Sequence, residues 1–295
     1  MQSNEHNISL WILSLLILSV SGLNIWRGEE KRFYYVYGGK LAELNEFRPT
    51  AQLGFRQTAM DETTWFCGGV YIAPLAILTA AHCFYSEEGA VNVVRLNDRG
   101  NAYEVLETKE HPNFRFPVLY NDIGIVRLRK DLPDTPFVYP ACLPFINGGM
   151  FDYFTAVGWG QTEATALLQP RELIKVELQN FEDRCPSIYE PSDQLPEGYK
   201  NESQLCVGSA DHKDTCYGDS GGPLLTNQFE MNCRYQVVGI TSVGIACGIP
   251  NVPSVYTRVH FFLDWIQKEL SEELLQAAIS AISHHYHSRH DLSKY

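Results

Sequence analysis

The sequence predicts an all-β protein. Between Trp65 and Phe154, short runs rich in β-branched and aromatic residues alternate with turn residues, and the pattern returns at 153–161 and 235–260. Examples are residues 69–72, 90–95 and 123–128. This region has no long stretch with helical periodicity. Many short strands separated by turns are typical of a β-barrel or a β-sandwich.

The composition indicates a globular protein with an acidic surface. The chain has 295 residues, of which 45% are hydrophobic and 20% are charged, which is enough for one large core or two small ones. The net charge is −12 and no basic run is present. Phosphate binding needs clustered Lys and Arg, so we expect no nucleic-acid partner. The acidity favours solubility and, weakly, attraction of basic substrates.

The N-terminus predicts a signal peptide over residues 1–22. Residues 8–20 are apolar but short for a membrane span, and Val20 and Gly22 are small enough for cleavage after Gly22. The segment before them contains Glu5 and His6 and lacks Lys or Arg, so a signal anchor is the alternative. Eight cysteines agree with an oxidising compartment. We therefore expect a secreted, extracellular protein with no membrane attachment in its mature form.

Three separated motifs predict nucleophilic catalysis. Residues 218–223 read Gly-Asp-Ser-Gly-Gly-Pro, which places Ser220 on a tight turn between glycines. A serine hydroxyl is a weak nucleophile and needs a base, which in turn needs an orienting acid. His82 lies in Leu-Thr-Ala-Ala-His-Cys, and Asp122 lies in Asn-Asp-Ile-Gly-Ile. The order His, Asp, Ser is one of three unrelated orders in which this triad occurs.

With these motifs, the chain resembles serine endopeptidases of the chymotrypsin/trypsin family from about residue 36 to 270. Within that family it is similar to secreted arthropod enzymes of the snake and clip-domain type, although it shows no clip domain. The resemblance implies two six-stranded antiparallel β-barrels, at about 36–145 and 146–260, and a helix at about 260–270. The active site is then expected in the cleft between the barrels.

The resemblance also implies the catalytic roles. Ser220 attacks the peptide carbonyl, His82 takes and returns the proton, and Asp122 orients the imidazole. The N–H groups of Gly218 and Ser220 are expected to stabilise the oxyanion. No cofactor and no metal are expected. The alternative, from a different functional class, is a catalytically silent binding module with the same fold.

The segment before the catalytic domain predicts an unusual activation step. Residues 23–35 are expected to form a short propeptide, and Val36 is expected to become a new N-terminus whose amine pairs with Asp219. Family members are cut after Arg or Lys, but Tyr35 precedes Val36 and the basic pair at 31–32 lies three residues too early. The activator cuts after an aromatic residue, the overhang is trimmed, or activation is unconventional.

The resemblance places Asp214 at the floor of the specificity pocket, six residues before Ser220. An aspartate there selects Arg or Lys by charge pairing. The alternative is that Asp214 is a surface acid in a loop.

Other pocket positions depart from the family pattern. Ser242 and Gly244 match the strand that binds the substrate backbone, but Val243 replaces the usual Trp. Ser254 stands where trypsin has a glycine. Its hydroxymethyl group could narrow the slot, hindering Arg more than Lys, or could form a hydrogen bond with the incoming cation.

The cysteines predict four disulfides. The resemblance implies the pairs Cys67–Cys83, Cys185–Cys206 and Cys216–Cys247. Cys142 and Cys233 remain, and we expect them to pair with each other. The cysteine spacing does not fit a zinc site.

Several peripheral features complete the predictions. Residues 201–203 form the glycosylation sequon Asn-Glu-Ser, so we expect a glycan on Asn201. The segment from 96 to 111 is too short for a calcium cage. Apolar spacings of three and four predict that the C-terminal helix extends into residues 271–295. The His-rich tail there could bind metal, but a disordered polar tail is the simpler interpretation.

The implied partners follow from this function. They are protein substrates, serpin or Kunitz-type inhibitors, and an upstream activating protease.

Overall fold

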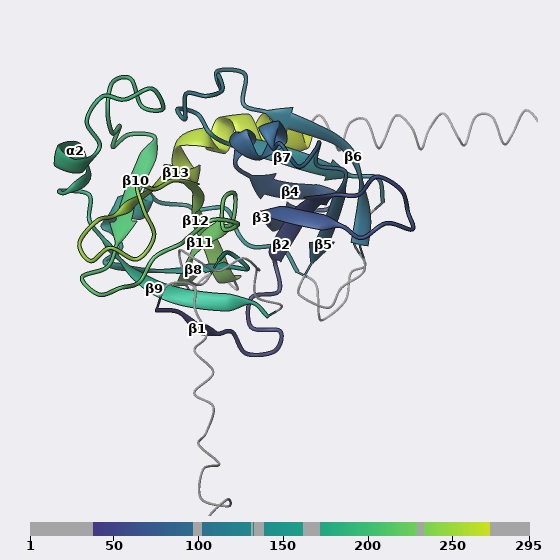
Figure 1. Cartoon of the computed structure of the whole chain (residues 1–295), viewed down its shortest axis with the longest axis horizontal. Helices are drawn as coiled ribbons and strands as arrows, with labels where there is room; N and C mark the ends of the chain where they lie inside the picture. Colours follow the sequence, from purple (N-terminus) through teal and green to yellow (C-terminus); the bar gives the residue numbers. More distant parts are fainter. Residues whose placement is uncertain are drawn as a thin grey trace, which may run out of the picture. The chain divides into compact units, whose positions relative to one another are not determined.

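Two antiparallel β-sheets form the framework of the described chain (Figure 1). The computed structural model describes residues 38–96, 102–130, 132, 139–161, 172–228 and 233–271. The predicted signal peptide, the propeptide, Val36 and the tail beyond residue 271 lie outside the described residues. No helix within these ranges is long and apolar enough to cross a membrane.

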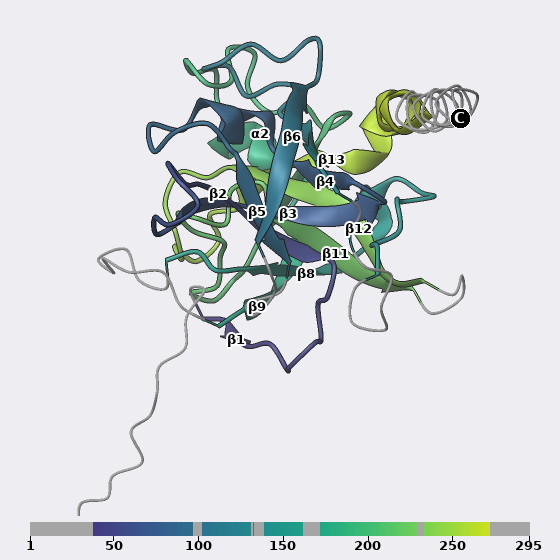
Figure 2. The ribbon, with the colours of Figure 1, turned by 90° about the vertical axis from the view of Figure 1, so that its right-hand side faces the viewer.

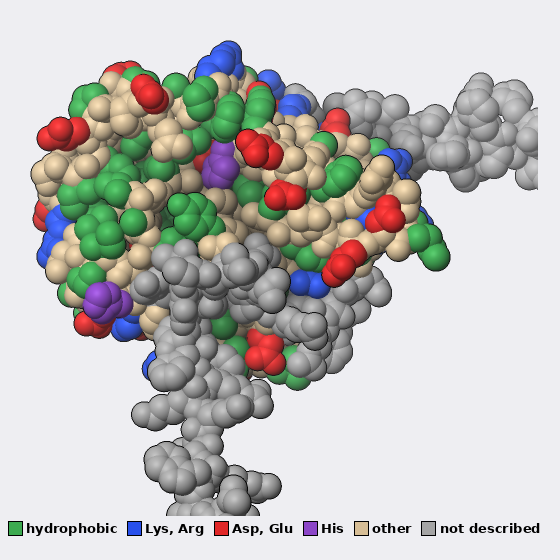
Figure 3. All heavy atoms as spheres, in the orientation of Figure 1, with side chains coloured by type: hydrophobic (Ala, Val, Ile, Leu, Met, Phe, Trp, Pro, Cys, Tyr) green, Lys and Arg blue, Asp and Glu red, His purple; other side chains and the backbone are tan. Residues whose placement is uncertain are grey.

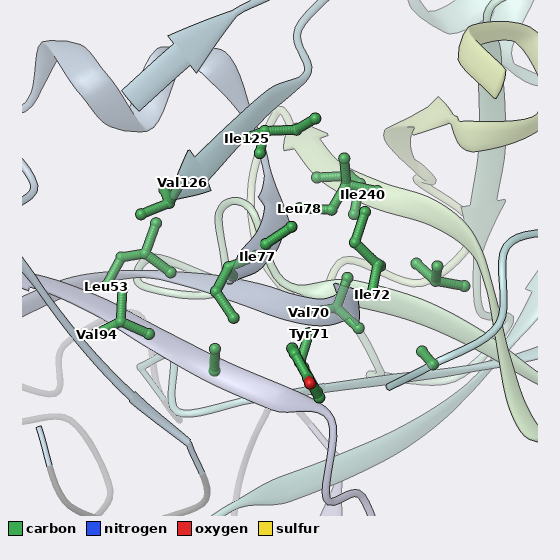
Figure 4. Close-up of a cluster of buried hydrophobic side chains, with 14 of the residues drawn as sticks. Leu53, Val70, Tyr71, Ile72, Ile77, Leu78, Val94, Ile125, Val126 and Ile240 are labelled. Carbon is green, nitrogen blue, oxygen red and sulfur yellow. The ribbon is translucent and has the colours of Figure 1, made fainter. Parts of the chain in front are cut away.

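The first sheet closes into a six-stranded barrel. Its hydrogen-bonded order is β2-β3-β4-β7-β6-β5. The strands are β2 (Thr50–Phe55), β3 (Thr64–Ala73), β4 (Ala76–Thr79), β5 (Val93–Leu96), β6 (Ala102–Glu110) and β7 (Gly124–Leu128). Inward side chains alternate along each strand and meet in the hydrophobic cluster of Figure 4, where Leu53, Ile77 and Ile125 are at most 1% exposed. This close packing gives the barrel a rigid wall on which loops can be positioned.

The second sheet also closes. Its order is β9-β10-β13-β12-β11-β8, and β8 pairs with β9 to complete the ring. The strands are β8 (Tyr153–Gly158), β9 (Ile174–Asn180), β10 (Gln204–Gly208), β11 (Pro223–Gln228), β12 (Cys233–Val243) and β13 (Ser254–Arg258). Phe154, Leu178, Leu205 and Tyr256 are at most 2% exposed and belong to its core. The prediction of two six-stranded barrels is confirmed.

Each end of the described chain contacts the barrel that is more distant in sequence. The N-terminal strand contacts the second barrel, and the C-terminal helix contacts the first. Strand β1 (Lys40–Leu41) pairs with β9 of the second sheet, although its residues were expected in the first barrel. At the other end, the 3₁₀ helix η4 (Val259–Phe262) leads into helical residues 263–271, close to the predicted range of 260–270. Figures 1 and 2 show this helix over the first barrel, and Ile266 is fully buried in that barrel's cluster.

Short helices and disulfides fix the connecting loops. The elements are the 3₁₀ helices η1 (Ala81–Tyr85) and η2 (Gly148–Met150) and the α-helix α2 (Cys185–Ile188). The disulfides Cys67–Cys83, Cys185–Cys206 and Cys216–Cys247 are present. Cys142 is also disulfide-bonded, but the side chain of Cys233 lies outside the described residues, so their pairing stays a prediction.

Candidate active site

His82 and Asp122 form a buried pair at the edge of the first barrel. The Nδ1 atom of His82 lies 2.7 Å from Oδ2 of Asp122, and the backbone N–H of His82 donates to Oδ1 at 2.9 Å. Asp122 is fully buried, whereas the side chain of His82 is 18% exposed. The imidazole therefore has one nitrogen held by a carboxylate while its other edge faces outward, which is the geometry of an oriented general base.

Local structure explains why these two side chains meet. His82 lies in η1, directly after β4, and the Cys67–Cys83 disulfide ties that turn to β3. Asp122 precedes β7, which pairs with β4. Asn121 has a φ of 55°, in the left-handed region that asparagine tolerates. This turn directs Asp122 toward η1.

Two hydroxyl groups from the second barrel complete the environment of Asp122. Ser242 donates from Oγ to Oδ2 of Asp122 at 2.5 Å, and Thr257 donates from Oγ1 to its backbone carbonyl at 2.7 Å. Ser242 was predicted only as part of the substrate-binding strand, and Thr257 was not predicted at all. The carboxylate of a first-barrel turn is thus held in place by β12 and β13.

The turn that carries Ser220 is fixed from both barrels. The N–H of Gly68 in β3 donates to the carbonyl of Ser220 at 2.7 Å, and the N–H of Gly221 donates to the carbonyl of Thr241 at 2.9 Å. Gly221 has a φ of 78°, and a side chain there would collide with Thr79. Glycine is therefore required at this position, and the turn presents the serine to the cavity that also contains His82.

The peptide group between Tyr217 and Gly218, next to Ser220, is held by one hydrogen bond. The carbonyl of Tyr217 accepts a hydrogen bond from the N–H of Gln161 at 2.7 Å. In a trans peptide the following N–H points the opposite way, so the N–H of Gly218 is directed away from that partner. Gly218 has a φ of 94°, and within the described chain neither its N–H nor that of Ser220 donates to a protein acceptor. These two donors are free for a developing negative charge.

The electrostatics of the pair suit proton transfer. Burial opposes the charged form of His82, but the charge of Asp122 and their hydrogen bond outweigh it and raise the pKa of His82 above its usual 6.5. Burial likewise disfavours the charged form of Asp122, but His82 and the Ser242 hydroxyl outweigh this and lower its pKa. The aspartate is thus ionised whenever the imidazole accepts a proton.

Asp219 is a second buried carboxylate, next to the nucleophile. It is 1% exposed and accepts hydrogen bonds from the N–H groups of Gly160 and Cys216, each at 2.8 Å. Burial raises its pKa to about 6. A side chain at Gly158 or Gly160 would collide with this carboxylate, so the slot around it is narrow.

A cavity of about 420 Å³ opens beside Ser220 and His82. Its lining includes the Cys216–Cys247 disulfide, Val243, Gly244 and Ser254. Asp214 lies behind Ser254: it is 2% exposed and does not line the cavity.

Asp214 is held by three hydrogen bonds. Ser254 donates from Oγ to Oδ1 at 2.9 Å, the N–H of Thr215 donates to Oδ1 at 2.8 Å, and the N–H of Gly248 donates to Oδ2 at 3.3 Å. Burial raises the pKa of Asp214 to about 7 despite these bonds. Asp214 is therefore a buried carboxylate capped by the Ser254 hydroxyl, and the surface-acid interpretation does not fit this burial.

One face of the molecule is hollowed near its middle. Figure 3 shows a histidine in this hollow, hydrophobic side chains gathered on the side of the second barrel, and acidic side chains on the side of the first. Within the described ranges, only Cys67, His82 and Cys83 cluster as metal ligands would. The sulfur atoms of Cys67 and Cys83 form a disulfide, so these two residues offer no thiolate to a metal.

Comparison with known proteins identifies the family. The sequence model of the trypsin family matches residues 36–266. The chain therefore belongs to the trypsin family of serine proteases.

Individual members of the family are also similar to this chain in sequence. The chain is 36% identical over 247 residues to "Serine protease snk" of Drosophila melanogaster, covering 79% of this chain and 56% of the relative. It is 34% identical over 261 residues to "Phenoloxidase-activating enzyme 1" of Spodoptera litura, covering 80% and 67% respectively. The chain thus spans little more than half the length of the Drosophila protease.

The fold also matches a solved structure. Neuropsin, a serine protease expressed in the limbic system of mouse brain, superimposes with a TM-score of 0.66 at 27% sequence identity. The match covers 79% of this chain and 99% of neuropsin.

Proposed function

We propose that this protein is a secreted serine endopeptidase that uses His82, Asp122 and Ser220 as its catalytic triad. The observation that carries the proposal is the 2.7 Å contact between His82 and Asp122 at the mouth of the cavity that also contains Ser220. In the proposed reaction, His82 removes the hydroxyl proton of Ser220 as its oxygen attacks the carbonyl of the scissile peptide. The imidazolium then donates that proton to the leaving amine, and water hydrolyses the acyl-enzyme by the same steps in reverse order.

The two backbone donors beside the nucleophile are proposed to stabilise the tetrahedral intermediates. The N–H groups of Gly218 and Ser220 lack protein acceptors in the described chain, which supports this role. Loss of one such donor typically costs about 3–4 kcal/mol of the activation barrier.

We further propose cleavage after basic residues, with Lys preferred over Arg. The hydroxyl of Ser254 donates its proton to Asp214 and keeps its lone pairs for a donor in the cavity. A substrate ammonium can donate to that oxygen while Asp214 balances the charge. A guanidinium needs both carboxylate oxygens for its paired hydrogen bonds, and Ser254 occupies the approach to one of them. The Ser242–Gly244 strand is proposed to bind the substrate backbone.

Activation is proposed to free the amine of Val36 for pairing with Asp219. The support is a buried carboxylate that no cation among the described residues neutralises, since its hydrogen-bond partners are two backbone N–H groups. An uncompensated buried charge is costly, so a new ammonium group there would stabilise the surrounding loop.

The cellular setting is proposed from the sequence and the relatives. Eight cysteines and three disulfides favour an extracellular location. Some relatives are named phenoloxidase-activating proteins, which supports protein substrates and an upstream activating protease for this chain. Serpin and Kunitz-type inhibitors are proposed as further partners.

Two covalent features belong to the same proposal. Cys142 lies beside β12, where its N–H donates to the carbonyl of Tyr235 at 3.0 Å, which favours pairing with Cys233 at the start of that strand. Asn201 is exposed, which suits the proposed glycan.

A catalytically silent binding module is the second candidate, and the residue before Val36 favours it. Tyr35 gives a basic-specific activator nothing to recognise. A phosphonate that reacts with active-site serines separates the candidates. Labelling of Ser220 in a chain that begins at Val36 supports the protease, and a folded chain that stays unlabelled supports the binding module.

A further inference from the structure

A second cavity lies away from the active site, beside the glycosylation sequon. It measures about 610 Å³ and is lined by Tyr120, Asn121, residues 200–203 and Phe261. These residues come from three segments: the turn before Asp122, the loop before β10, and η4. We call this cavity the sequon groove.

The amide of Asn201 is held in one orientation at the edge of the groove. Its Oδ1 accepts hydrogen bonds from Nη2 of Arg258 at 3.0 Å and from the hydroxyl of Tyr199 at 3.2 Å. Arg258 is 1% exposed, and Glu182 accepts from its Nη2 at 2.5 Å, so the guanidinium is itself fixed.

The orientation of the Asn201 amide also fixes the direction of its Nδ2 atom. Both partners of Asn201 are donors, so its oxygen must face them. The Nδ2 atom then faces away from Arg258, and within the described chain it has no hydrogen-bond partner. Nδ2 is the atom to which an N-glycan is attached, so the buried arginine presents the attachment point at the lip of the groove.

The groove has the chemistry of a sugar-binding surface. Phe261 is 51% exposed, although a large apolar ring is favoured in a covered position. The ring of Tyr120 is already covered by the ammonium group of Lys200, which lies 4.3 Å from its centre. An aromatic ring packs against the C–H face of a pyranose. Polar side chains such as Asn121 and Glu202 can form hydrogen bonds with the hydroxyl groups of the sugar.

We propose that the first N-acetylglucosamine on Asn201 docks into the sequon groove against Phe261. The glycan then acts as a structural element that joins the loop before β10 to η4 and to the turn that leads into Asp122. This proposal rests on glycosylation of Asn201. It adds a defined position and a stabilising role for the first sugar.

The test measures the melting temperature of variants made in a glycosylating cell line. Ser203→Ala removes the sequon without changing the amide of Asn201, and the Ser203 hydroxyl has no hydrogen-bond partner within the described chain. Ser203→Thr is the matched control because it keeps the sequon. Phe261→Ala keeps the sequon but removes the aromatic ring.

The expected result is a coupling between the sugar and the ring. Ser203→Ala should lower the melting temperature by about 2–4 °C, the shift typical of one ordinary contact in a domain of this size. Ser203→Thr should leave it unchanged, and so should trimming with an endoglycosidase that leaves a single N-acetylglucosamine. In the Phe261→Ala background, loss of the sequon should cause no further shift.

Two results would overturn the proposal, and they are distinguishable. A mass measurement that finds no glycan on Asn201 would contradict both the proposed glycosylation and the proposed docking. If the glycan is present, its loss could shift the melting temperature equally with and without Phe261. That result would contradict the docking alone and leave the glycosylation standing.

Discussion

The substitution Ser254→Gly should change the protease from Lys to Arg preference. In the native pocket, Ser254 Oγ lies 2.9 Å from Oδ1 of Asp214, and Ser254 lines the cavity whereas Asp214 does not. The space around the Ser254 hydroxyl is tight, because a β-carbon at Gly244 would lie 2.9 Å from Oγ of Ser254. Removing the hydroxymethyl group opens a path from the cavity to the carboxylate.

The size of the effect follows from the strength of one hydrogen bond to a charged group. A guanidinium that reaches Asp214 gains a hydrogen bond to a charged group, worth about 1.5–3 kcal/mol. The Arg-to-Lys ratio of kcat/KM should therefore rise about 10- to 100-fold. The ammonium of a Lys substrate loses its contact with the hydroxyl, which adds to the change in the ratio.

The assay compares matched Lys and Arg peptide amides on a chain that begins at Val36. Ser254→Ala is the control, since it removes the hydroxyl but keeps most of the obstruction, and it should weaken Lys cleavage without improving Arg cleavage. An unchanged Arg-to-Lys ratio in Ser254→Gly would refute the idea that Ser254 separates the substrate from Asp214.

Three further predictions concern the charged groups. The raised pKa of His82 means that kcat/KM should fall as pH drops through a value above 6.5, and a pH–rate profile with its acidic midpoint below 6.5 would contradict this. Ser242→Ala removes a hydrogen bond to the ionised Asp122, so kcat should fall about 10- to 100-fold with little change in KM, because a bond to a charged group contributes about 1.5–3 kcal/mol; equal kcat in both proteins would reject the positioning role. For Asp219, the folded pKa of about 6 lies above the usual value of 3.8 for an aspartate, so the folded state binds more protons between these values. The uncleaved chain should therefore lose up to about 3 kcal/mol of stability as pH rises from about 4 to 6, and a chain with a free Val36 amine should lose less. Denaturant unfolding at both pH values measures this, and equal losses would contradict the proposed pairing.

The elements that could be predicted from the sequence are those encoded in short, local patterns. The motifs around His82, Asp122 and Ser220 each span only a few residues. In the structure His82 and Ser220 line one cavity, and the buried Asp122 contacts His82. The strands were predicted by alternation, which depends only on near neighbours in the chain.

Features that depend on distant contacts could not be predicted. Ser242 lies 120 residues from Asp122, and nothing in its own segment indicates which carboxylate it contacts. Strand β1 has two residues, too few to show any period, and its partner is set by β9.

The pocket illustrates the same limit. The sequence indicated that Ser254 and Asp214 both belong to the pocket, but their order along its axis depends on side-chain directions. Only the structure places the hydroxyl in front of the carboxylate.

The most direct test of the account is hydrolysis of a Lys peptide amide by a chain that begins at Val36, with Ser220→Ala as control. This design bypasses the activation cut after Tyr35. A working triad should give turnover that is abolished by Ser220→Ala. A folded chain that turns over neither Lys, Arg nor Phe amides would contradict it and favour the binding module.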